Sequence, residues 1–287
     1  MAIAPIPAEF HHEGVALRGW FARPNNEADT PVIILQHGLS GIASLDLPEY
    51  AEYFVAAGFA CFAYDHRNWG KSAGEPRGES DPWQQVADLR AAISFVRNQA
   101  WVDSNRIGLW GTSYGGGHVL TVTALDNRIR CAVSQVPLVS GSRTFELWIP
   151  AEKHQAMLKN LSTERDARMR GDKPITVPPA REGSDTEKWV TSKDKSGHYV
   201  NELTLLSFDH LRSYEPISFA AQITRTPLMI IVASDDTQTP VSWQKEAFAS
   251  ITAPAKLVEI EGEHYDVYLD KLDEAAMAAQ SWFVENL

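Results

Sequence analysis

A serine between two glycines follows a short apolar run near the middle of the chain, in the pattern Gly111-x-Ser113-x-Gly115. Residues 107–110 predict a buried strand, and residues 114–125 predict a helix packed on a sheet. A strand that reverses into a helix so quickly holds the serine at the apex in a strained backbone with an exposed hydroxyl. A Cβ two residues before or after the serine would clash in such a turn, which explains both glycines. The pattern therefore predicts an α/β fold that presents Ser113 as a nucleophile.

Two backbone amides are candidates for an oxyanion hole beside this serine. The amide of Tyr114 begins the predicted helix, where unpaired N–H groups and the helix dipole favour an anion. A second donor is expected from another strand end, because the apolar run 31–36 leads into His37-Gly38-Leu39, and the glycine lets the following backbone approach a substrate. We assign this donor to the amide of Leu39. His37 itself is interpreted as an orienting or packing residue of the turn.

Composition narrows the class of protein. A chain of 287 residues with 44% hydrophobic content is long enough for one large α/β domain with an insertion, or for two small domains. A net charge of -11 and a pI near 5.3 argue against nucleic acid or an anionic membrane surface as partners. Cys61 and Cys131 lie in apolar, strand-like contexts, which predicts buried reduced thiols and no metal site. We expect no metal and no cofactor, and we leave a homo-oligomer open.

The sequence also bears on the compartment. No apolar run approaches the length of a transmembrane helix, and residues 1–7 lack the basic and apolar parts of a signal peptide. These features predict a cytoplasmic protein that is not bound to a membrane.

The rest of the chain alternates predicted strands and helices around the serine turn. Residues 10–23 predict an antiparallel hairpin at a sheet edge, and Asp81-Pro82 predicts the start of a helix that runs to about residue 99. The charged loop 65–72 is interpreted as structural, with Trp69 touching the site. The remaining expected elements are helices at 47–58, 241–251 and 267–285 and strands at 59–64, 130–136, 226–233 and 256–260.

Between residues 138 and 222 this alternation stops. The segment is rich in aromatic and charged residues, with a helix expected from about 150 to 170, and a long excursion inside an α/β domain is usually a lid or a substrate-binding element. We therefore predict a core made of residues 1–137 and 223–287, with 138–222 as an inserted cap. Phe145 and Trp148 follow soon after the strand that ends near Pro137, so we expect their rings, with Trp69, in the substrate pocket.

Three polar residues fall just after three separate predicted strands, in the chain order Ser113, Asp236 and His264. The carboxyl ends of parallel strands share one edge of a sheet, which is where such folds place their sites. A serine hydroxyl is a weak nucleophile at neutral pH, so a histidine must take its proton and a carboxylate must hold the imidazole. The sequence thus predicts a catalytic triad at this edge.

Five motifs together resemble the α/β-hydrolase superfamily, whose triads share this chain order: His37-Gly38, Asp65-x-Arg67-x-x-Gly70-x-Ser72, Gly111-x-Ser113-x-Gly115, Asp236-x-x-x-Pro240 and Gly262-x-His264. Within the superfamily the chain looks closest to the dienelactone-hydrolase and X-prolyl-peptidase-like esterases, including relatives that act as polyketide acyltransferases. The resemblance implies a mostly parallel eight-stranded sheet with helices on both faces. It also implies a helical cap inserted between the sixth and seventh strands.

The resemblance also bears on which acid and which histidine act. Asp235 is adjacent to Asp236, and the family spacing to Pro240 favours Asp236. Some relatives take the acid from the preceding strand, but residues 132–145 contain no Asp or Glu. A glycine-flanked turn after a late strand distinguishes His264 from five other histidines: His66, His118, His154, His198 and His210.

The expected activity is that of a serine esterase, which cleaves a carboxylic ester or thioester through an acyl-enzyme on Ser113. Acyl transfer to an acceptor other than water uses the same intermediate, and lactonase or peptidase activity is also open. Dehalogenase and epoxide hydrolase relatives attack with an aspartate, so Ser113 disfavours their chemistry. A reading from a different class is a ligand-binding pseudoenzyme, against which the intact set of serine, acid and histidine weighs.

Overall fold

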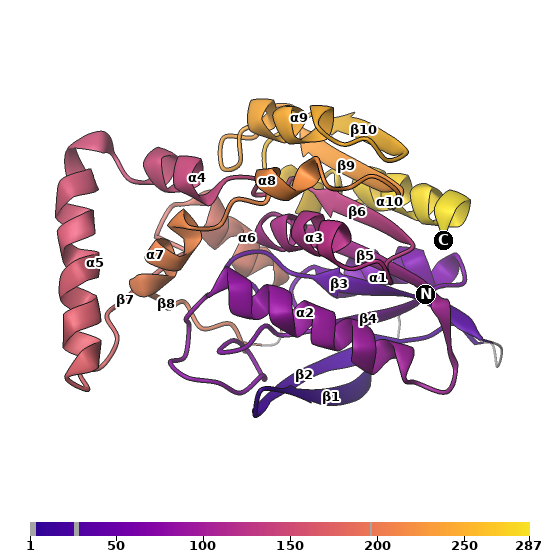
Figure 1. Cartoon of the computed structure of the whole chain (residues 1–287), viewed down its shortest axis with the longest axis horizontal. Helices are drawn as coiled ribbons and strands as arrows, with labels where there is room; N and C mark the ends of the chain where they lie inside the picture. Colours follow the sequence, from indigo (N-terminus) through magenta and orange to yellow (C-terminus); the bar gives the residue numbers. More distant parts are fainter. Residues whose placement is uncertain (1–3, 26–28, 196) are drawn as a thin grey trace.

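The computed structural model describes residues 4–25, 29–195 and 197–287, and its centre is one eight-stranded sheet with helices on both faces (Figure 1). Across the sheet the strands follow the order β1-β2-β4-β3-β5-β6-β9-β10. Their bounds are β1 (Ile6–His12), β2 (Val15–Ala22), β3 (Thr30–Gln36), β4 (Ala60–Tyr64), β5 (Val102–Thr112), β6 (Cys131–Gln135), β9 (Leu228–Ala233) and β10 (Ala255–Ile260). The pairs β1–β2 and β2–β4 are antiparallel, and every other pair of neighbouring strands in this sheet is parallel. The predicted sheet is confirmed.

Helices cover both faces because the central strands carry apolar side chains in both directions. Val32 and Ile34 of β3 belong to an apolar cluster that includes residues of α2 (Pro82–Arg97), α3 (Tyr114–Leu125) and α9 (Val241–Ala249). Ile33 and Leu35, which point the other way, pack with α1 (Leu47–Ala56) and α10 (Leu272–Asn286). The parallel strands are therefore buried on both sides, and their carboxyl ends meet at one edge.

Local sequence signals account for several element boundaries. The side chain of Asp81 accepts hydrogen bonds from the backbone N–H groups of Trp83 and Gln84 at 2.9 and 3.3 Å, and Pro82 occupies the first turn, as predicted for the start of α2.

The prediction of one closing helix that begins at residue 267 is wrong at the N-terminal end of that helix. A 3₁₀ turn, η2 (Asp266–Tyr268), comes first, and Leu269 has φ -117° and ψ -109°, which is not helical.

The cap segment, residues 138–222, lies between β6 and β9, the sixth and seventh strands of the sheet in chain order. It contains α4 (Gly141–Trp148), η1 (Ala151–Lys153), α5 (His154–Met169), β7 (Thr176–Val177), α6 (Asp185–Lys193), β8 (Leu203–Thr204), α7 (Leu206–Arg212) and α8 (Ile217–Ala220). Figure 1 shows α4, α5, α7 and the β7–β8 pair beyond one end of the sheet, whereas α8 lies against α3.

We propose the division into a core of residues 1–137 and 223–287 and a cap of residues 138–222. Residues 1–3 and 26–28 of that core and 196 of that cap lie outside the described residues.

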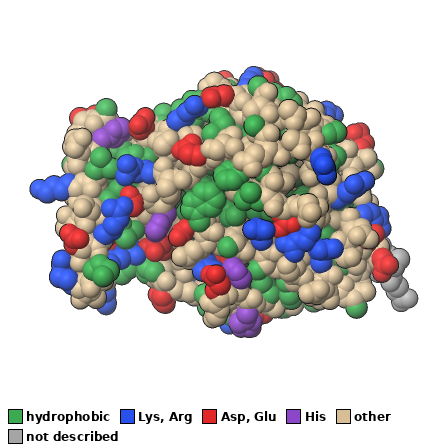
Figure 2. Space-filling model, in the orientation of Figure 1, with side chains coloured by type: hydrophobic (Ala, Val, Ile, Leu, Met, Phe, Trp, Pro, Cys, Tyr) green, Lys and Arg blue, Asp and Glu red, His purple; other side chains and the backbone are tan. Residues whose placement is uncertain are grey.

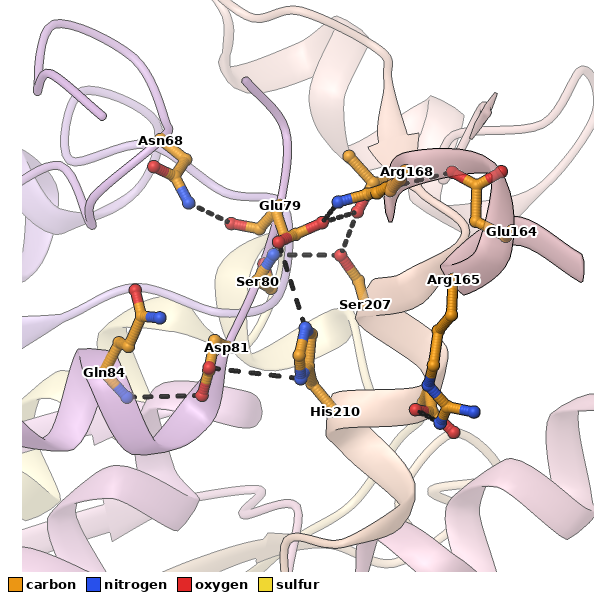
Figure 3. Close-up of polar contacts among 12 residues, drawn as sticks. Asn68, Glu79, Ser80, Asp81, Gln84, Glu164, Arg165, Arg168, Ser207 and His210 are labelled. Carbon is orange, nitrogen blue, oxygen red and sulfur yellow. Dashed lines mark hydrogen bonds and ion pairs between the residues drawn. The ribbon is translucent and has the colours of Figure 1, made fainter. Parts of the chain in front are cut away.

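A charged clasp, made of Glu79, Arg168 and His210, ties the loop before α2 to the cap segment (Figure 3). The guanidinium of Arg168 on α5 donates to the carboxylate of Glu79. His210 Nε2 on α7 lies 3.9 Å from Glu79 Oε1, and the hydroxyl of Thr204 donates to Glu79 Oε2 at 3.0 Å. One carboxylate of the core thus contacts α5, β8 and α7.

We expect Glu79→Gln to lower the free energy of unfolding at pH 7 by about 1.5 kcal/mol, at the low end for charged hydrogen bonds because the clasp is partly solvated. Burial acts to raise the pKa of Glu79, but hydrogen bonds from His210, Arg168 and Thr204 outweigh it and lower that pKa. A lowered pKa contributes stability above the unfolded-state value and loses it as the pH falls through the folded-state value. Urea unfolding from pH 7 into acid should therefore show the difference shrinking.

The control for this prediction is Glu246→Gln, which removes the partner of Arg143 from an ion pair in which both side chains are exposed. Exposed pairs contribute little, so this variant should unfold like the wild type. A loss in Glu79→Gln that persists unchanged in acid would contradict the role of the Glu79 charge.

Cys61 and Cys131 are free and buried, as predicted, and burial raises the pKa of both thiols. Basic and acidic side chains are interspersed on the face shown in Figure 2. Across the described ranges, none of the helices is both long and apolar enough to cross a membrane.

Candidate active site

Ser113 lies at the sharp turn between β5 and α3, with φ 54° and ψ -119°. This positive φ is rare for a residue with a side chain and indicates local backbone strain. A Cβ added to Gly111 would lie 2.5 Å from the carbonyl oxygen of Gly115, and one added to Gly115 would lie 2.5 Å from that of His37. The steric reason predicted for the two glycines is confirmed.

The structure brings Ser113, His264 and Asp236 together at the carboxyl edge of the sheet. His264 Nε2 lies 3.2 Å from Ser113 Oγ, and His264 Nδ1 lies 2.8 Å from Asp236 Oδ2. His264 follows β10 after Gly262, whose φ of 134° favours glycine and whose added Cβ would lie 2.5 Å from the side-chain Oδ2 of Asp266. Because the ionised carboxylate can only accept, Nδ1 carries the proton and Nε2 is free to accept from the serine hydroxyl.

Asp236 is buried and accepts several hydrogen bonds from its own loop. Its Oδ1 accepts from the backbone N–H groups of Gln238 and Thr239 at 2.9 and 2.8 Å, and Thr239 Oγ1 lies 2.9 Å from Oδ2. Burial acts to raise the pKa of Asp236, but the charge and hydrogen bond of His264 and the hydrogen bonds of Thr239 outweigh it and lower that pKa. The carboxylate is therefore held ionised. Sequence reasoning missed Thr239, although an Asp three residues before a Thr is a common turn signal.

The neighbouring acid, Asp235, is placed differently. Its side chain is exposed, and its Oδ2 accepts from the hydroxyl of Ser234 at 2.8 Å. Its backbone N–H donates to the carbonyl of Gly262 at 2.9 Å, which links the loops after β9 and β10. The geometry thus brings Asp236, and not Asp235, to His264.

The turn after β3 holds the Gly38 carbonyl in a fixed direction. His37 Nδ1 donates to this oxygen at 2.9 Å, Gly41 N–H donates to it at 3.1 Å, and His37 Nε2 accepts from the backbone N–H of His66 at 3.1 Å. Burial lowers the pKa of His37, so its ring is neutral, as this pair of hydrogen bonds requires. In a trans peptide the next N–H, that of Leu39, points opposite to the held carbonyl. The orienting reading of His37 agrees with this geometry.

A cavity of about 350 Å³ opens above Ser113 and His264 and is lined by both core and cap residues. The cap contributes apolar side chains, among them Trp148, Ile149, Val177, Leu203 and Phe208. The core contributes Leu39 and the rings of Tyr265 and Tyr268. The indole N–H of Trp148 also donates to the backbone carbonyl of Gln238 at 3.1 Å, which ties the cap to the loop of Asp236.

Two of the three predicted pocket rings do not line this cavity. Trp69 is buried in its own loop, where its indole N–H contacts the carbonyl of Glu79 and the hydroxyl of Ser80. Phe145 faces the inside of the cap and packs with Leu161 and Leu206. Their placement in the pocket was wrong, because Trp69 bonds within its loop and Phe145 lies on the face of α4 turned toward α5 and α7.

The described part of the chain contains no group of three or more His, Cys, Asp or Glu side chains that could hold a metal ion.

Comparison with known proteins places this arrangement in a family. The family model described as serine aminopeptidase, S33, matches residues 27–266. The quorum-quenching protein AidA of Acinetobacter baumannii is 30% identical over 99% of this chain and 95% of its own length. The thiohydrolase aneE of Aspergillus aculeatus is 26% identical over 96% of this chain and 91% of its own length.

A solved structure agrees with these sequence matches. The alpha/beta hydrolase GrgF from Penicillium sp. sh18 is 25% identical and superposes with a TM-score of 0.86, covering 99% of this chain and 98% of its own. With a family model matched over most of its length and a fold shared along the whole chain, this protein belongs to the serine aminopeptidase S33 family of the α/β-hydrolase superfamily.

Proposed function

We propose that this protein is a serine hydrolase that cleaves a carboxylic ester or thioester through an acyl-enzyme on Ser113. The observation that carries the proposal is the continuous set of contacts from Ser113 Oγ to His264 and on to Asp236, at 3.2 and 2.8 Å. A relative named as a thiohydrolase agrees with thioester cleavage.

Each residue of this set has a separate task. As Ser113 Oγ attacks the acyl carbon, its proton moves to His264 Nε2, and Asp236 stabilises the imidazolium through Nδ1. The same proton then passes to the departing alcohol or thiol. In the second half, a water gives a proton to Nε2 and attacks the acyl-enzyme, and Ser113 regains its hydroxyl as the acid leaves.

We assign the oxyanion hole to the amides of Tyr114 and Leu39. Tyr114 follows the nucleophile at the first turn of α3, and Leu39 lines the cavity beside the held Gly38 carbonyl. Each donor of this kind contributes roughly 3 to 4 kcal/mol to transition-state stabilisation in other enzymes. The two N–H groups approach the intermediate from different strand ends, so the hole depends on the fold of the sheet edge.

The cap wall of the cavity combines apolar side chains with Arg181, Asp185 and Thr186, and its apolar part favours a hydrophobic or aromatic group on the substrate. Ile149, Val177, Leu203 and Phe208 offer apolar contact surface, and Trp148 adds a ring beside the acid loop. We therefore expect an apolar acyl or alcohol group to bind against the cap, with the scissile carbonyl at Ser113.

We expect kcat/KM of the wild type to rise by about one to two orders of magnitude when the acyl chain of a p-nitrophenyl ester is lengthened by two to three carbons, at about 0.8 kcal/mol per methylene. In Trp148→Ala, kcat/KM should be highest for a longer acyl chain than in the wild type, because the substitution enlarges the cavity. Trp148→Phe keeps an aromatic ring but loses the N–H to Gln238 and part of the ring volume, so its profile should shift less than that of Trp148→Ala. Flat, superimposable profiles for all three proteins would contradict a specificity role for the cap.

Acyl transfer is a second candidate, because a relative is named as polyketide transferase grgF, 26% identical over 88% of this chain and 87% of its own length. Transfer and hydrolysis share the acyl-enzyme and differ in whether water or another acceptor takes the acyl group. Product analysis with an added alcohol or amine acceptor separates them. A partition ratio that follows acceptor concentration favours transfer.

The decisive experiment is reaction with a fluorophosphonate probe followed by mass spectrometry of the peptides. We expect one stoichiometric adduct on Ser113. A folded protein that binds hydrophobic esters but forms no adduct on Ser113 would favour a ligand-binding pseudoenzyme.

A further inference from the structure

A fully buried glutamine outside the triad contacts the catalytic acid. Gln244 lies on α9, and its Nε2 is 3.1 Å from Asp236 Oδ2 and also donates to the carbonyl of Thr239. Both partners are acceptors, so the NH₂ side of the amide must face them. Gln244 Oε1 consequently faces the interior and has no hydrogen-bond partner in the part of the chain that the structure describes.

An unpartnered buried oxygen costs stability, so a purely structural role explains this glutamine poorly. Leucine or methionine would fill the same volume, but either would leave Asp236 Oδ2 and the carbonyl of Thr239 without this donor. The amide makes sense if its N–H groups serve the two acceptors that they face.

The other donors to the same oxygen are not equivalent to Gln244. Thr239 has one hydroxyl proton and two acceptors within reach, Asp236 Oδ2 at 2.9 Å and the carbonyl of Val136 at 3.1 Å. The third donor, His264 Nδ1–H, is itself the group that the carboxylate must orient. Gln244 therefore supplies a donor to Oδ2 that comes from a helix of the core and takes no part in the reaction.

We propose that Gln244 is a positioning residue for the reaction, which fixes the rotation of the Asp236 carboxylate and limits its basicity through a hydrogen bond to Oδ2. The proposal rests on the proposed function, since it assigns Gln244 a task in the same triad. Gln244 does not line the substrate cavity, so its effect should fall on kcat and leave KM unchanged.

The sign of the pH effect follows from charge. A donor withdraws negative charge from Oδ2, so its removal leaves a carboxylate that attracts the imidazolium more strongly. The His264–Asp236 pair of a Gln244→Leu variant should then take up a proton at higher pH than the wild type. The acid limb of the kcat/KM profile should move in the same direction.

Few other titratable groups face this pair. The rings of Tyr265 and Tyr268 lie 5.2 and 6.0 Å from that of His264. Burial raises the pKa of Tyr265 to about 12 and that of Tyr268 well above its usual range, so both stay neutral near neutral pH. Asp185 on α6 acts on Tyr265, and Asp235 is exposed and bonded to Ser234. The two tyrosines therefore add no charge beside the pair near neutral pH.

The test compares the wild type with Gln244→Leu and with a control, Gln85→Leu. Gln85 is also a buried glutamine, and its Oε1 contacts His118 Nε2 at 3.0 Å, away from the triad. Proton NMR follows the downfield resonance of the His264 Nδ1–H through a pH titration, and ester hydrolysis gives kcat, KM and the acid limb. We expect Gln244→Leu to lower kcat about tenfold and to move the NMR midpoint and the acid limb to higher pH.

Gln85→Leu, the control, should have a lower free energy of unfolding but leave the NMR midpoint and the acid limb of the kcat/KM profile unchanged. The proposal is overturned if Gln244→Leu leaves the NMR midpoint where the wild type has it, because the glutamine is then structural only. If the wild type hydrolyses no ester and takes no probe, the proposed function fails, while the NMR titration still decides the contact between Gln244 and Asp236.

A second variant, Gln244→Glu, keeps the volume and covers the case in which Gln244→Leu does not fold. The introduced carboxyl can donate while protonated, but once ionised it only accepts and repels Asp236. We expect kcat/KM to rise and then fall with pH, where the wild type rises and levels. A levelling profile with wild-type kcat in this variant would also overturn the proposal.

Discussion

Ser113→Ala is expected to lower kcat for short p-nitrophenyl esters by about 10⁶-fold, the size of loss seen when a triad serine is removed. The physical reason is that the 3.2 Å contact between His264 Nε2 and Ser113 Oγ is the only route by which the imidazole reaches a nucleophile in the described site. Hydrolysis assays measure the loss, and circular dichroism shows whether the fold is unchanged. A rate within tenfold of the wild type would contradict the nucleophile assignment.

The matched control for this variant is Ser113→Gly, which also lacks the hydroxyl but removes the Cβ from a residue at φ 54°. Both variants should be equally inactive. Glycine adopts this backbone without strain, so Ser113→Gly should unfold with a free energy about 1 kcal/mol higher than Ser113→Ala. Urea denaturation measures the difference, and equal stabilities would show that the turn holds no strain at this residue.

The parts of the site that sequence reasoning could anticipate are those set by local backbone rules. Gly111 and Gly115 flank Ser113 because neither has space for a Cβ, which at Gly111 would meet the carbonyl of Gly115 in the same turn and at Gly115 the carbonyls of Gln36 and His37 at the end of β3. The acid and the histidine follow the ends of β9 and β10, and parallel strands place such ends at one edge. Spacing along the chain therefore carries the information.

The pocket and the surroundings of the acid depend on contacts that spacing does not encode. Whether Phe145 or Trp148 faces the cavity depends on how α4 rotates against α5 and α7, and both lie on the same short helix. Phe208 reaches the cavity from a helix 95 residues after Ser113 in the chain. Gln244 follows Asp236 by only eight residues, but their contact depends on how the first turn of α9 is rotated toward the loop of Asp236. The contacts of α4 and Phe208 follow from tertiary packing, and none of these contacts leaves a periodic signal in the sequence.

Asp236→Asn is expected to lower kcat by about 10⁴-fold, while Asp235→Asn should change it little. Asp236 Oδ2 accepts from His264 Nδ1 at 2.8 Å, and an amide at this position can present its NH₂ to the ring and so favour the wrong tautomer. The same substitution removes the carboxylate charge that stabilises the imidazolium. Steady-state kinetics on one ester at pH 8 measures both variants.

Asp235→Asn is a closely matched control, because it makes the same chemical change one residue away. Its carboxylate is exposed and accepts from Ser234, and its link to the histidine loop runs through its backbone N–H, which the substitution keeps. The reaction of Ser113 with the fluorophosphonate probe should be slower in Asp236→Asn and unchanged in Asp235→Asn, since phosphonylation needs the same deprotonation of Ser113. If Asp235→Asn lost more activity than Asp236→Asn, Asp235 would be the catalytic acid. The loop after β9 would then have to shift by one residue in solution to bring Asp235 to His264.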